Sequence, residues 1–276
     1  MIKLVNHMNE KTKINAMQKH SELYWFFDNS LVLTKRSIKH IIKNMDQLLS
    51  IILMPVMFLL LFRYAFGGAI NTGGTSYVNF LVAGILVQTL AFGASTTTLN
   101  IVIDLQRGIV DRFRSLPMAS SSLLIAHVTA DLFRNAISAI IMLSVSFLVG
   151  FRPTADALDW VKIFALILMF TFAFSWFSAI LGLLVKSLEA AQWLGFVIIM
   201  PLTFASSAFV PTESMPTFLR VFAENQPFTH VIGAMRAWMV GTPIGNSGWL
   251  AFVWCIGIIV ISIPVANWLF KRKTLK

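Results

Sequence analysis

Six long apolar stretches constrain this chain more than any other feature. Each has the roughly 20 residues that an α-helix needs to cross a hydrocarbon core of about 30 Å. Helices are the expected form, because a segment surrounded by lipid must satisfy its backbone hydrogen bonds internally. The third stretch contains Asp131 and Arg134, and the fifth is broken by Pro201. The predicted spans are 48–66, 77–101, 124–149, 160–185, 192–210 and 248–270.

The composition argues against a soluble domain. Of 276 residues, 57% are hydrophobic and 12% are charged, whereas soluble domains carry about 25% charged residues. A chain of this length cannot form a core large enough to hide so much apolar surface from water. The single cysteine, Cys255, excludes an internal disulfide and a Cys-x-x-Cys site. The predicted fold class is therefore an all-α membrane protein with six transmembrane helices.

The distribution of positive charge predicts the orientation. Most of the 22 Lys and Arg residues fall in segments that would face one side of the membrane. Positive residues concentrate on the cytoplasmic side, so we expect a multi-pass protein of the plasma or bacterial inner membrane with both termini in the cytoplasm. This topology and anionic lipid account for the net charge of +10. A nucleic-acid partner is not expected.

Four regions follow one another along the chain. Residues 1–29 form a polar cytoplasmic segment, which lacks the apolar core of a signal peptide at its start. Residues 30–46 alternate apolar and basic positions at helical spacing and predict an amphipathic helix in the headgroup plane. A surface anchor is favoured there over a specific binding role. Residues 47–270 form the membrane domain, and 271–276 are a basic cytoplasmic tail.

No residue pattern indicates an enzyme. The histidines are scattered without a metal-ligand spacing, and the chain has no G-x-x-x-x-G-K-[S/T] phosphate loop. We therefore expect no catalytic residue, metal or cofactor on this chain. If the protein moves a substrate, the energy comes from another chain or from an ion gradient.

The segment after the second span, about 104–118, concentrates charges in an otherwise apolar chain. Asp104, Arg107 and Asp111 fall at helical spacing, and Pro117 ends the pattern. One interpretation is a solvated connector. The other is a short helix that docks a cytoplasmic partner, with Phe113 as its apolar anchor. The candidate contacts are Asp104, Arg107, Gly108, Asp111, Arg112, Phe113, Arg114, Ser115, Leu116 and Pro117.

Two charges inside the third span need an explanation. Asp131 and Arg134 are three residues apart, so they can pair on one face of a helix. A charge at this depth is costly and normally faces protein or water. The structural interpretation is a pair that holds the span in the bundle. The functional one is a role in a substrate path or in gating.

Ordered motifs between about residues 77 and 241 resemble one known family. They are Tyr77–Thr89, Asp104–Pro117, Ala130–Asn135, Gly150–Arg152, Pro201–Pro211, Met215–Pro216 and Asn225–Arg236. Together they resemble the membrane subunit of type-2 ATP-binding-cassette exporters, and most closely the daunorubicin-resistance branch.

The resemblance implies a division of labour. Two six-helix permease subunits, identical or paralogous, would form the pathway, and separate cytoplasmic ATPase subunits would carry ATP and Mg. The coupling helix of the family maps onto 104–118, and residues 211–247 would form re-entrant helices on the outer side. The substrate would be a hydrophobic or amphipathic drug, lipid or peptide-like molecule.

Small and hydroxylated residues in the second and fifth spans have two interpretations. Gly93 and Thr97 form a small-x-x-x-small pair, which favours close helix packing. Alternatively, polar residues of these spans line a transport path or a dimer seam, where the resemblance places the central cavity. The candidates are Gln88, Phe92, Gly93, Thr96, Thr97, Phe204, Ser206, Ser207 and Phe209.

Two other classes of function remain open on the residues alone. A secondary transporter or channel driven by an ion gradient would show ionisable relays and an inverted repeat. The sequence offers one Asp–Arg pair and no evident repeat. A membrane enzyme or scaffold would show a cluster of catalytic residues at the interface, which is not apparent.

Overall fold

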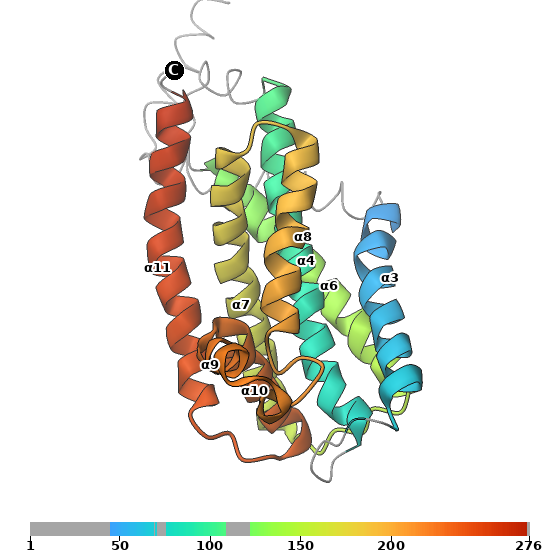
Figure 1. Ribbon diagram of the computed structural model, residues 1–276. Coiled ribbons are helices and arrows are strands. Elements are labelled where there is room, and N and C mark those ends of the chain that lie inside the picture. The colour runs from blue at the N-terminus through green and yellow to red at the C-terminus, as the bar shows by residue number, and fades with distance from the viewer. Residues whose placement is uncertain (1–44, 69, 71–75, 109–121, 275–276) are drawn as a thin grey trace, which may run out of the picture.

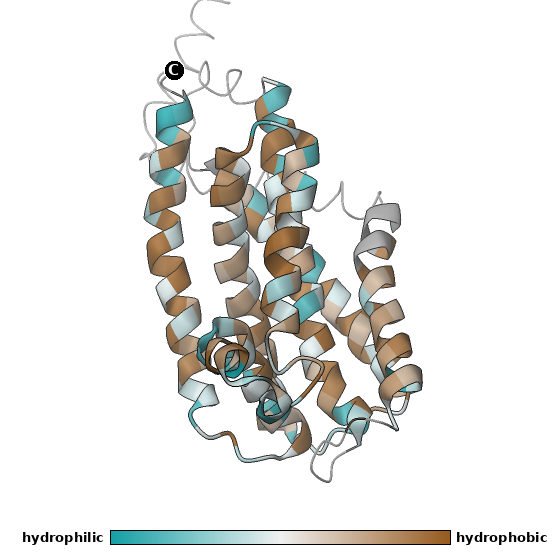
Figure 2. Ribbon diagram, viewed as in Figure 1, coloured by the Kyte–Doolittle hydropathy of each residue, from teal (hydrophilic) through white to brown (hydrophobic). Residues whose placement is uncertain are grey.

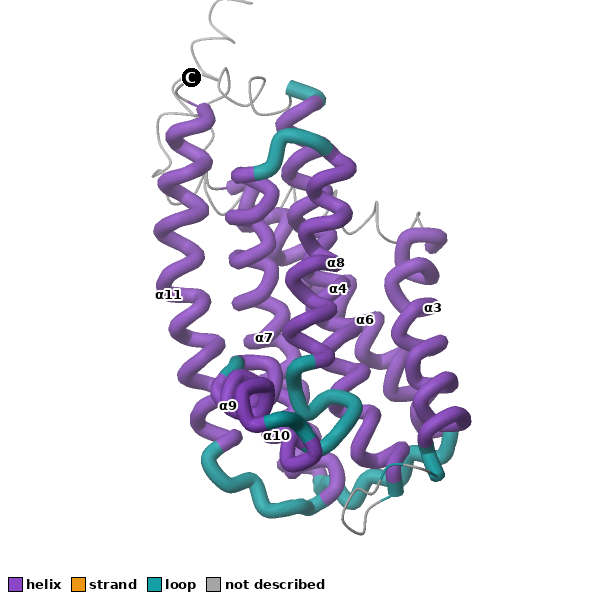
Figure 3. The backbone as a smooth tube through the Cα atoms, in the orientation of Figure 1, coloured by secondary structure: helices purple, strands orange, loops and turns teal. Residues whose placement is uncertain are grey.

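The computed structural model describes residues 45–68, 70, 76–108 and 122–274. Every regular element in these ranges is helical (Figure 3), as the composition predicts. The helices are α3 (Met45–Leu61), continued by the π-helical η1 (Phe62–Phe66), α4 (Tyr77–Gln106), α6 (Ser122–Leu148), α7 (Ala157–Leu184), α8 (Leu188–Phe204), the 3-10 turn η2 (Thr212–Ser214), α9 (Thr217–Asn225), α10 (Pro227–Val240) and α11 (Ser247–Thr274).

Helix α4 is the centre of the bundle. It packs against α3, α6, α7, α8 and α10, and 83% of its most apolar 18-residue stretch is buried. Helix α11 packs on α7 and α10 at the edge, and only 22% of its most apolar stretch is buried. Figure 1 shows this arrangement, with α11 and α3 at opposite sides. Because the mean hydropathy of α11, 2.4, exceeds the 1.7 of α4, the difference in burial indicates that the exposed face of α11 meets lipid.

Local chemistry sets where the helices begin and end. Ser76, Asp156 and Ser187 are N-caps whose side chains accept from the backbone N–H three residues later, in α4, α7 and α8. Helix α10 ends at Gly241, whose φ of 72° suits glycine best. These caps fall at loop positions between predicted spans, so the boundaries agree with the apolar pattern.

Four described helices are long and apolar enough to cross a membrane, namely α4, α6, α7 and α11. The remaining two predicted spans correspond to the shorter apolar helices of α3 with η1 and of α8. The end of the fifth span is a correction: the helix stops at Phe204, not at 210. Gln226 donates from Nε2 to the carbonyls of Leu202 and Ala205 at 2.7 and 2.9 Å, and so satisfies the last turn.

Two short helices cross the lower end of the bundle in Figure 1. One of them is α9, over Thr217–Asn225. On its exposed side Glu224 accepts from Arg220 Nε at 2.7 Å, and this hydrogen bond raises the pKa of the Arg220 guanidinium. Helix α10 packs on α4, α7 and α11. Helix α10 therefore joins the central helix α4 to the peripheral helix α11.

The opposite end of the bundle is basic. Helix α11 finishes with Lys271, Arg272 and Lys273, and Figure 2 shows this hydrophilic end above a long hydrophobic stretch. The predicted segments 1–29 and 30–46 lie outside the described residues, apart from Met45 and Asp46, which lie in α3. The interfacial helix stays a prediction.

Candidate functional site

A fully buried ion pair lies near the middle of α6. Arg134 donates from Nη2 to Asp131 Oδ1, one turn earlier, and the two side chains are 2% and 1% exposed. The predicted pairing is confirmed. A buried charge without its partner is strongly destabilising, so each residue requires the other.

Hydroxyl groups from the two neighbouring helices surround this pair. Thr97 of α4 and Ser175 of α7 donate to Asp131 Oδ2, the serine at 3.2 Å. Thr96 accepts from Arg134 Nη2 and lies 3.4 Å from Asp131 Oδ1. We call these five residues, from three helices, the polar cluster. Because its charges cancel and its carboxylate is well supplied with donors, the cluster stabilises one relative placement of α4, α6 and α7.

Close packing at Gly93 brings α4 and α6 together beside the cluster. Arg134 Nη2 donates to the carbonyl of Gly93 at 3.0 Å. A Cβ at position 93 would lie 1.9 Å from Asn135 Oδ1, so a larger residue does not fit without movement. Gly93 is thus a close-packing position between α4 and α6, in line with the packing interpretation of the Gly93–Thr97 pair.

Several polar atoms next to the cluster have no hydrogen-bond partner among the described residues. They are Nε of Arg134, both amide atoms of Asn135 and Oγ of Ser138. Buried polar groups normally bond to protein or to ordered water. These atoms can therefore hold water, or take new partners if α6 moves. Among the described residues, no three His, Cys, Asp or Glu side chains are grouped to hold a metal.

The second-span candidates lie inside one copy of the chain. Gln88, Gly93 and Thr97 are buried because α4 is covered by other helices, and Gln88 donates to Met200 Sδ at 4.0 Å. Phe92 is half-buried, with its ring 6.4 Å from that of Phe196. A role in a path or seam remains a prediction for them.

The fifth-span candidates separate into one exposed residue and three that fold inward. Phe204 ends α8 and is 48% exposed. Ser206, Ser207 and Phe209 lie beyond the helix and are buried, which corrects their placement in the span. The ring of Phe209 stacks on Phe62 of η1 with centroids 4.5 Å apart. Only Phe204 is positioned to meet another molecule directly.

Arg236 ties α10 to α4 and to the turn after α8. Its Nε donates to the carbonyl of Phe80 at 3.0 Å and its Nη2 to the carbonyl of Ser207. Its guanidinium carbon lies 3.6 Å from the centroid of the Phe80 ring, a cation–π contact. Among the described residues it forms no ion pair. The sequence gives no signal for these partners, which lie 156 and 29 positions away.

The end of α4 and the start of α6 are linked side by side. His127 Nε2 lies 2.8 Å from Asp104 Oδ2, and Gln106 donates to the carbonyl of Lys186 at 3.2 Å. The prediction of a separate docking helix from Asp104 is wrong at its start. Asp104 belongs to the last turns of α4, and the chain leaves the helix at Gly108, with φ of 63°. His127 was missed because a lone histidine carries no pattern.

The remaining loop candidates cannot be placed. Asp104, Arg107 and Gly108 are described, and the segment 109–121 lies outside the described residues. It contains Asp111, Arg112, Phe113, Arg114, Ser115, Leu116 and Pro117. Their role as partner contacts stays a prediction.

Comparison with known proteins gives consistent matches. Residues 29–240 match the ABC-2 type transporter family. A daunorubicin resistance ABC transporter permease of Streptomyces coeruleorubidus is 30% identical over 230 residues, 82% of this chain and 80% of the relative. A probable doxorubicin resistance permease of Mycobacterium tuberculosis is 25% identical and covers 92% of both chains. A putative transport permease, ycf38, of Cyanophora paradoxa is 27% identical, covering 96% of this chain and 95% of its own length.

Proposed function

The chain belongs to the ABC-2 type transporter family, and from this membership we propose that it works as a dimeric permease powered by separate cytoplasmic ATPase subunits. Its similar relatives are permease subunits of ABC transporters, so the chain is a transport component and not an enzyme. The absence of a phosphate loop from the sequence fits this division of labour. ATP and Mg would bind on the partner chain.

The link between Asp104 and His127 carries the proposal of ATP coupling. It joins the last turns of α4 to the start of α6, the two helices that bracket residues 109–121. A partner that moves this segment therefore pulls on both helices together. Deeper in the bundle the same two helices share the polar cluster. Displacement of the loop would thus be transmitted as a rigid-body shift of α4 and α6.

The proposed topology has six spans with both termini in the cytoplasm. Four helices are long enough to cross directly, and α3 with η1 and α8 would supply the other two. The basic end of α11 falls on the same side as the ends of α4 and α6 that bracket 109–121, as the positive-inside rule requires.

An exposed apolar face on α3 and α8 supports a second permease subunit, identical or paralogous. Met57 of α3, and Trp193 and Val197 of α8, are 57%, 67% and 59% exposed. Lipid can cover such a face, but aromatic residues are also frequent in protein interfaces. Phe204 lies at the end of this face of α8, where the dimer seam is proposed.

The proposed substrate is a hydrophobic or amphipathic molecule, such as a drug, lipid or peptide-like compound. Two relatives are named for resistance to daunorubicin and doxorubicin, which are amphipathic drugs. The described helices are predominantly apolar, in keeping with cargo that partitions into the membrane.

Co-purification tests the proposal. The chain would be co-expressed with an ATPase encoded by a neighbouring gene and purified in mild detergent. ATP hydrolysis by the purified sample would then be assayed. We expect the ATPase to co-purify and to be lost from the double variant Phe113→Ala/Arg114→Ala. A matched control exists on the outer helix α9, where Phe218→Ala/Arg220→Ala removes the same residue types from exposed positions.

The outcomes separate the proposed function from its rival. Loss of the ATPase from the loop variant alone supports coupling through 109–121. Purification of the chain without an ATPase, together with transport that persists without ATP, would contradict the proposal and favour a transporter driven by an ion gradient.

A further inference from the structure

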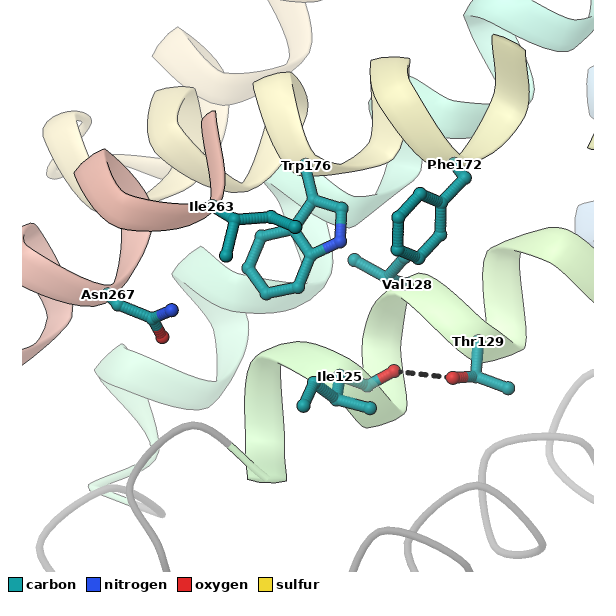
Figure 4. A pocket seen from close by; sticks show the side chains of 7 residues that line it. All are labelled: Ile125, Val128, Thr129, Phe172, Trp176, Ile263 and Asn267. Atoms are coloured by element: carbon teal, nitrogen blue, oxygen red, sulfur yellow. Dashed lines mark hydrogen bonds between the residues drawn. The ribbon is translucent and has the colours of Figure 1, made fainter. Parts of the chain in front are cut away.

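A cleft of about 420 Å³ lies between α6, α7 and α11 (Figure 4). Its apolar walls include Val128 of α6, Phe172 of α7 and Ile263 of α11. None of the residues that line it is charged. The volume is in the range of small-molecule sites, and the walls suit a hydrocarbon chain.

Two polar groups in this cleft have no partner among the described residues. Trp176 is only 3% exposed, yet its indole Nε1 makes no hydrogen bond. The Oδ1 atom of Asn267 is likewise unpartnered. In Figure 4 the indole nitrogen faces the space between the labelled side chains, and Asn267 borders that space from α11. A buried donor without an acceptor is unfavourable, so a bound molecule with an ester or carbonyl group would remove a defect.

Basic residues lie one helical turn beyond the cleft. Asn267 precedes Lys271 by four residues on α11, a rise of about 6 Å. Lys271, Arg272 and Lys273 are exposed at this end. Lys186 follows α7, the helix on which α11 packs. Burial and, after it, repulsion from Lys186 lower the pKa of the Lys273 ammonium. An anion placed between these two cations would relieve that repulsion.

From this arrangement we propose that the cleft binds one anionic phospholipid of the cytoplasmic leaflet. An acyl chain lies against Val128, Phe172 and Ile263, and an ester carbonyl accepts from Trp176 Nε1. Asn267 can turn its amide N–H toward the same ester region, and the phosphate meets Lys186 and Lys273. The proposal rests on the proposed orientation of the bundle, which places this end of α11 at the cytoplasmic headgroups.

Charge decides between lipid classes. A neutral lipid could fill the apolar walls but would leave the basic rim without a counter-charge. A soluble anion could meet the rim but not the cleft. Only a molecule with both an apolar chain and an anionic group matches the apolar walls near Ile263 and the basic residues near Lys273. By joining α6 and α7 to the peripheral α11, such a lipid would stabilise that side of the bundle.

Photo-crosslinking locates the bound lipid directly. The full chain would be reconstituted into phosphatidylethanolamine vesicles containing a trace of phosphatidylglycerol with a diazirine in its acyl chain. After irradiation, peptides would be mapped by mass spectrometry. We expect labelling to concentrate on the cleft segments of α6, α7 and α11. Unlabelled phosphatidylglycerol should compete, whereas extra phosphatidylethanolamine should not.

Substitution then tests the polar contact. Trp176→Phe keeps a ring and removes the donor, so labelling at the cleft should fall about 2- to 10-fold. Trp249→Phe, at an exposed position near the start of α11, is the matched control and should leave it unchanged. Lys186→Gln/Lys273→Gln should abolish the preference for phosphatidylglycerol over phosphatidylethanolamine.

Three results would overturn the proposal. One is labelling spread evenly over the exposed helix faces, and another is equal competition by both lipids. The third is displacement of the labelled lipid by a transported drug but not by phosphatidylglycerol, which would assign the cleft to cargo. Mapping on the unsubstituted chain does not depend on how the variants fold. No ATPase is needed, so the result is independent of the ATP-coupling test.

Discussion

Arg134 and Arg236 are both held within the helical bundle, but by different means. Arg134, fully buried in α6, is neutralised by one carboxylate and surrounded by hydroxyls. Arg236, half-buried in α10, donates to two backbone carbonyls and stacks on an aromatic ring. The first arrangement needs one particular side chain. The second uses the backbone carbonyls of Phe80 and Ser207, which remain when either side chain is substituted.

The surroundings explain why the two solutions differ. Asp131 and Arg134 sit within a regular helix, whose carbonyls are already bonded along the ladder. Ser207 lies in the turn after α8, where carbonyls are free of the helix ladder. The turn thus gives Arg236 a free carbonyl, and each arginine also donates to one carbonyl of α4, Arg134 to Gly93 and Arg236 to Phe80. The difference that matters is the carboxylate: because the polar cluster depends on a buried charge pair, it is more vulnerable to mutation than the contacts of Arg236.

The largest expected effect comes from removing the carboxylate. Asp131→Ala leaves the Arg134 guanidinium buried without a counter-charge, which should lower the free energy of unfolding by about 3–5 kcal/mol. Unfolding of the purified chain by SDS in mild detergent micelles, followed by circular dichroism, measures it. The double variant Asp131→Ala/Arg134→Leu should recover most of the loss, because an apolar pair replaces the ion pair. No recovery would mean that the pair is not the source of the stability.

The same substitution at both arginines sharpens the comparison. Arg236→Met leaves no charge behind and frees two carbonyls, so we expect a loss of about 1–3 kcal/mol. Arg134→Met strands the Asp131 carboxylate and should lose about 3–5 kcal/mol. Both variants would be compared in the same micelles by the same unfolding assay. Equal losses would show that backbone acceptors and a carboxylate are equivalent here.

Close packing at two glycines of α4 tests the two regions again. A Cβ at Gly84 would lie 2.3 Å from the carbonyl oxygen of Ala208, in the turn that Arg236 holds. A Cβ at Gly93 would meet the side chain of Asn135, which has no partner and can rotate. Gly84→Ala should therefore lose about 1–3 kcal/mol and Gly93→Ala less. If Gly93→Ala instead has the lower melting temperature, the turn at Ala208 accommodates a Cβ more easily than the Asn135 side chain does.

Features set by nearby residues could be predicted from the sequence. The spans follow from length and hydropathy, so the second, predicted over 77–101, begins at Tyr77 as observed. The ion pair follows from the three-residue spacing of Asp131 and Arg134. The overextended fifth span shows the limit. Residues 205–210 carry no charge, and positions 206–209 are buried within the protein. Hydropathy does not distinguish burial in protein from burial in lipid.

Contacts between distant residues could not be predicted. Ser175 reaches Asp131 from 44 positions away, and Arg236 reaches Phe80 from 156 positions away. Serine is common in apolar helices, and nothing in the local pattern separates Ser175 from Ser178 one turn later. Only the placement of α7 against α6 shows that one of them faces the carboxylate.

The smallest expected effect tests that distinction between two serines of α7. Ser175 donates to Asp131 Oδ2, whereas Ser178 Oγ has no hydrogen-bond partner among the described residues, and both side chains are buried. Ser175→Ala should lose about 0.5–1.5 kcal/mol, because Thr97 still donates to the same oxygen. Ser178→Ala removes an unsatisfied hydroxyl while its carbonyl still accepts from Thr98, so its stability should be unchanged or slightly higher. Parallel unfolding curves distinguish the two variants. Equal losses would mean that Ser175 only packs, which would leave α7 outside the polar cluster and reduce that cluster to a joint between α4 and α6.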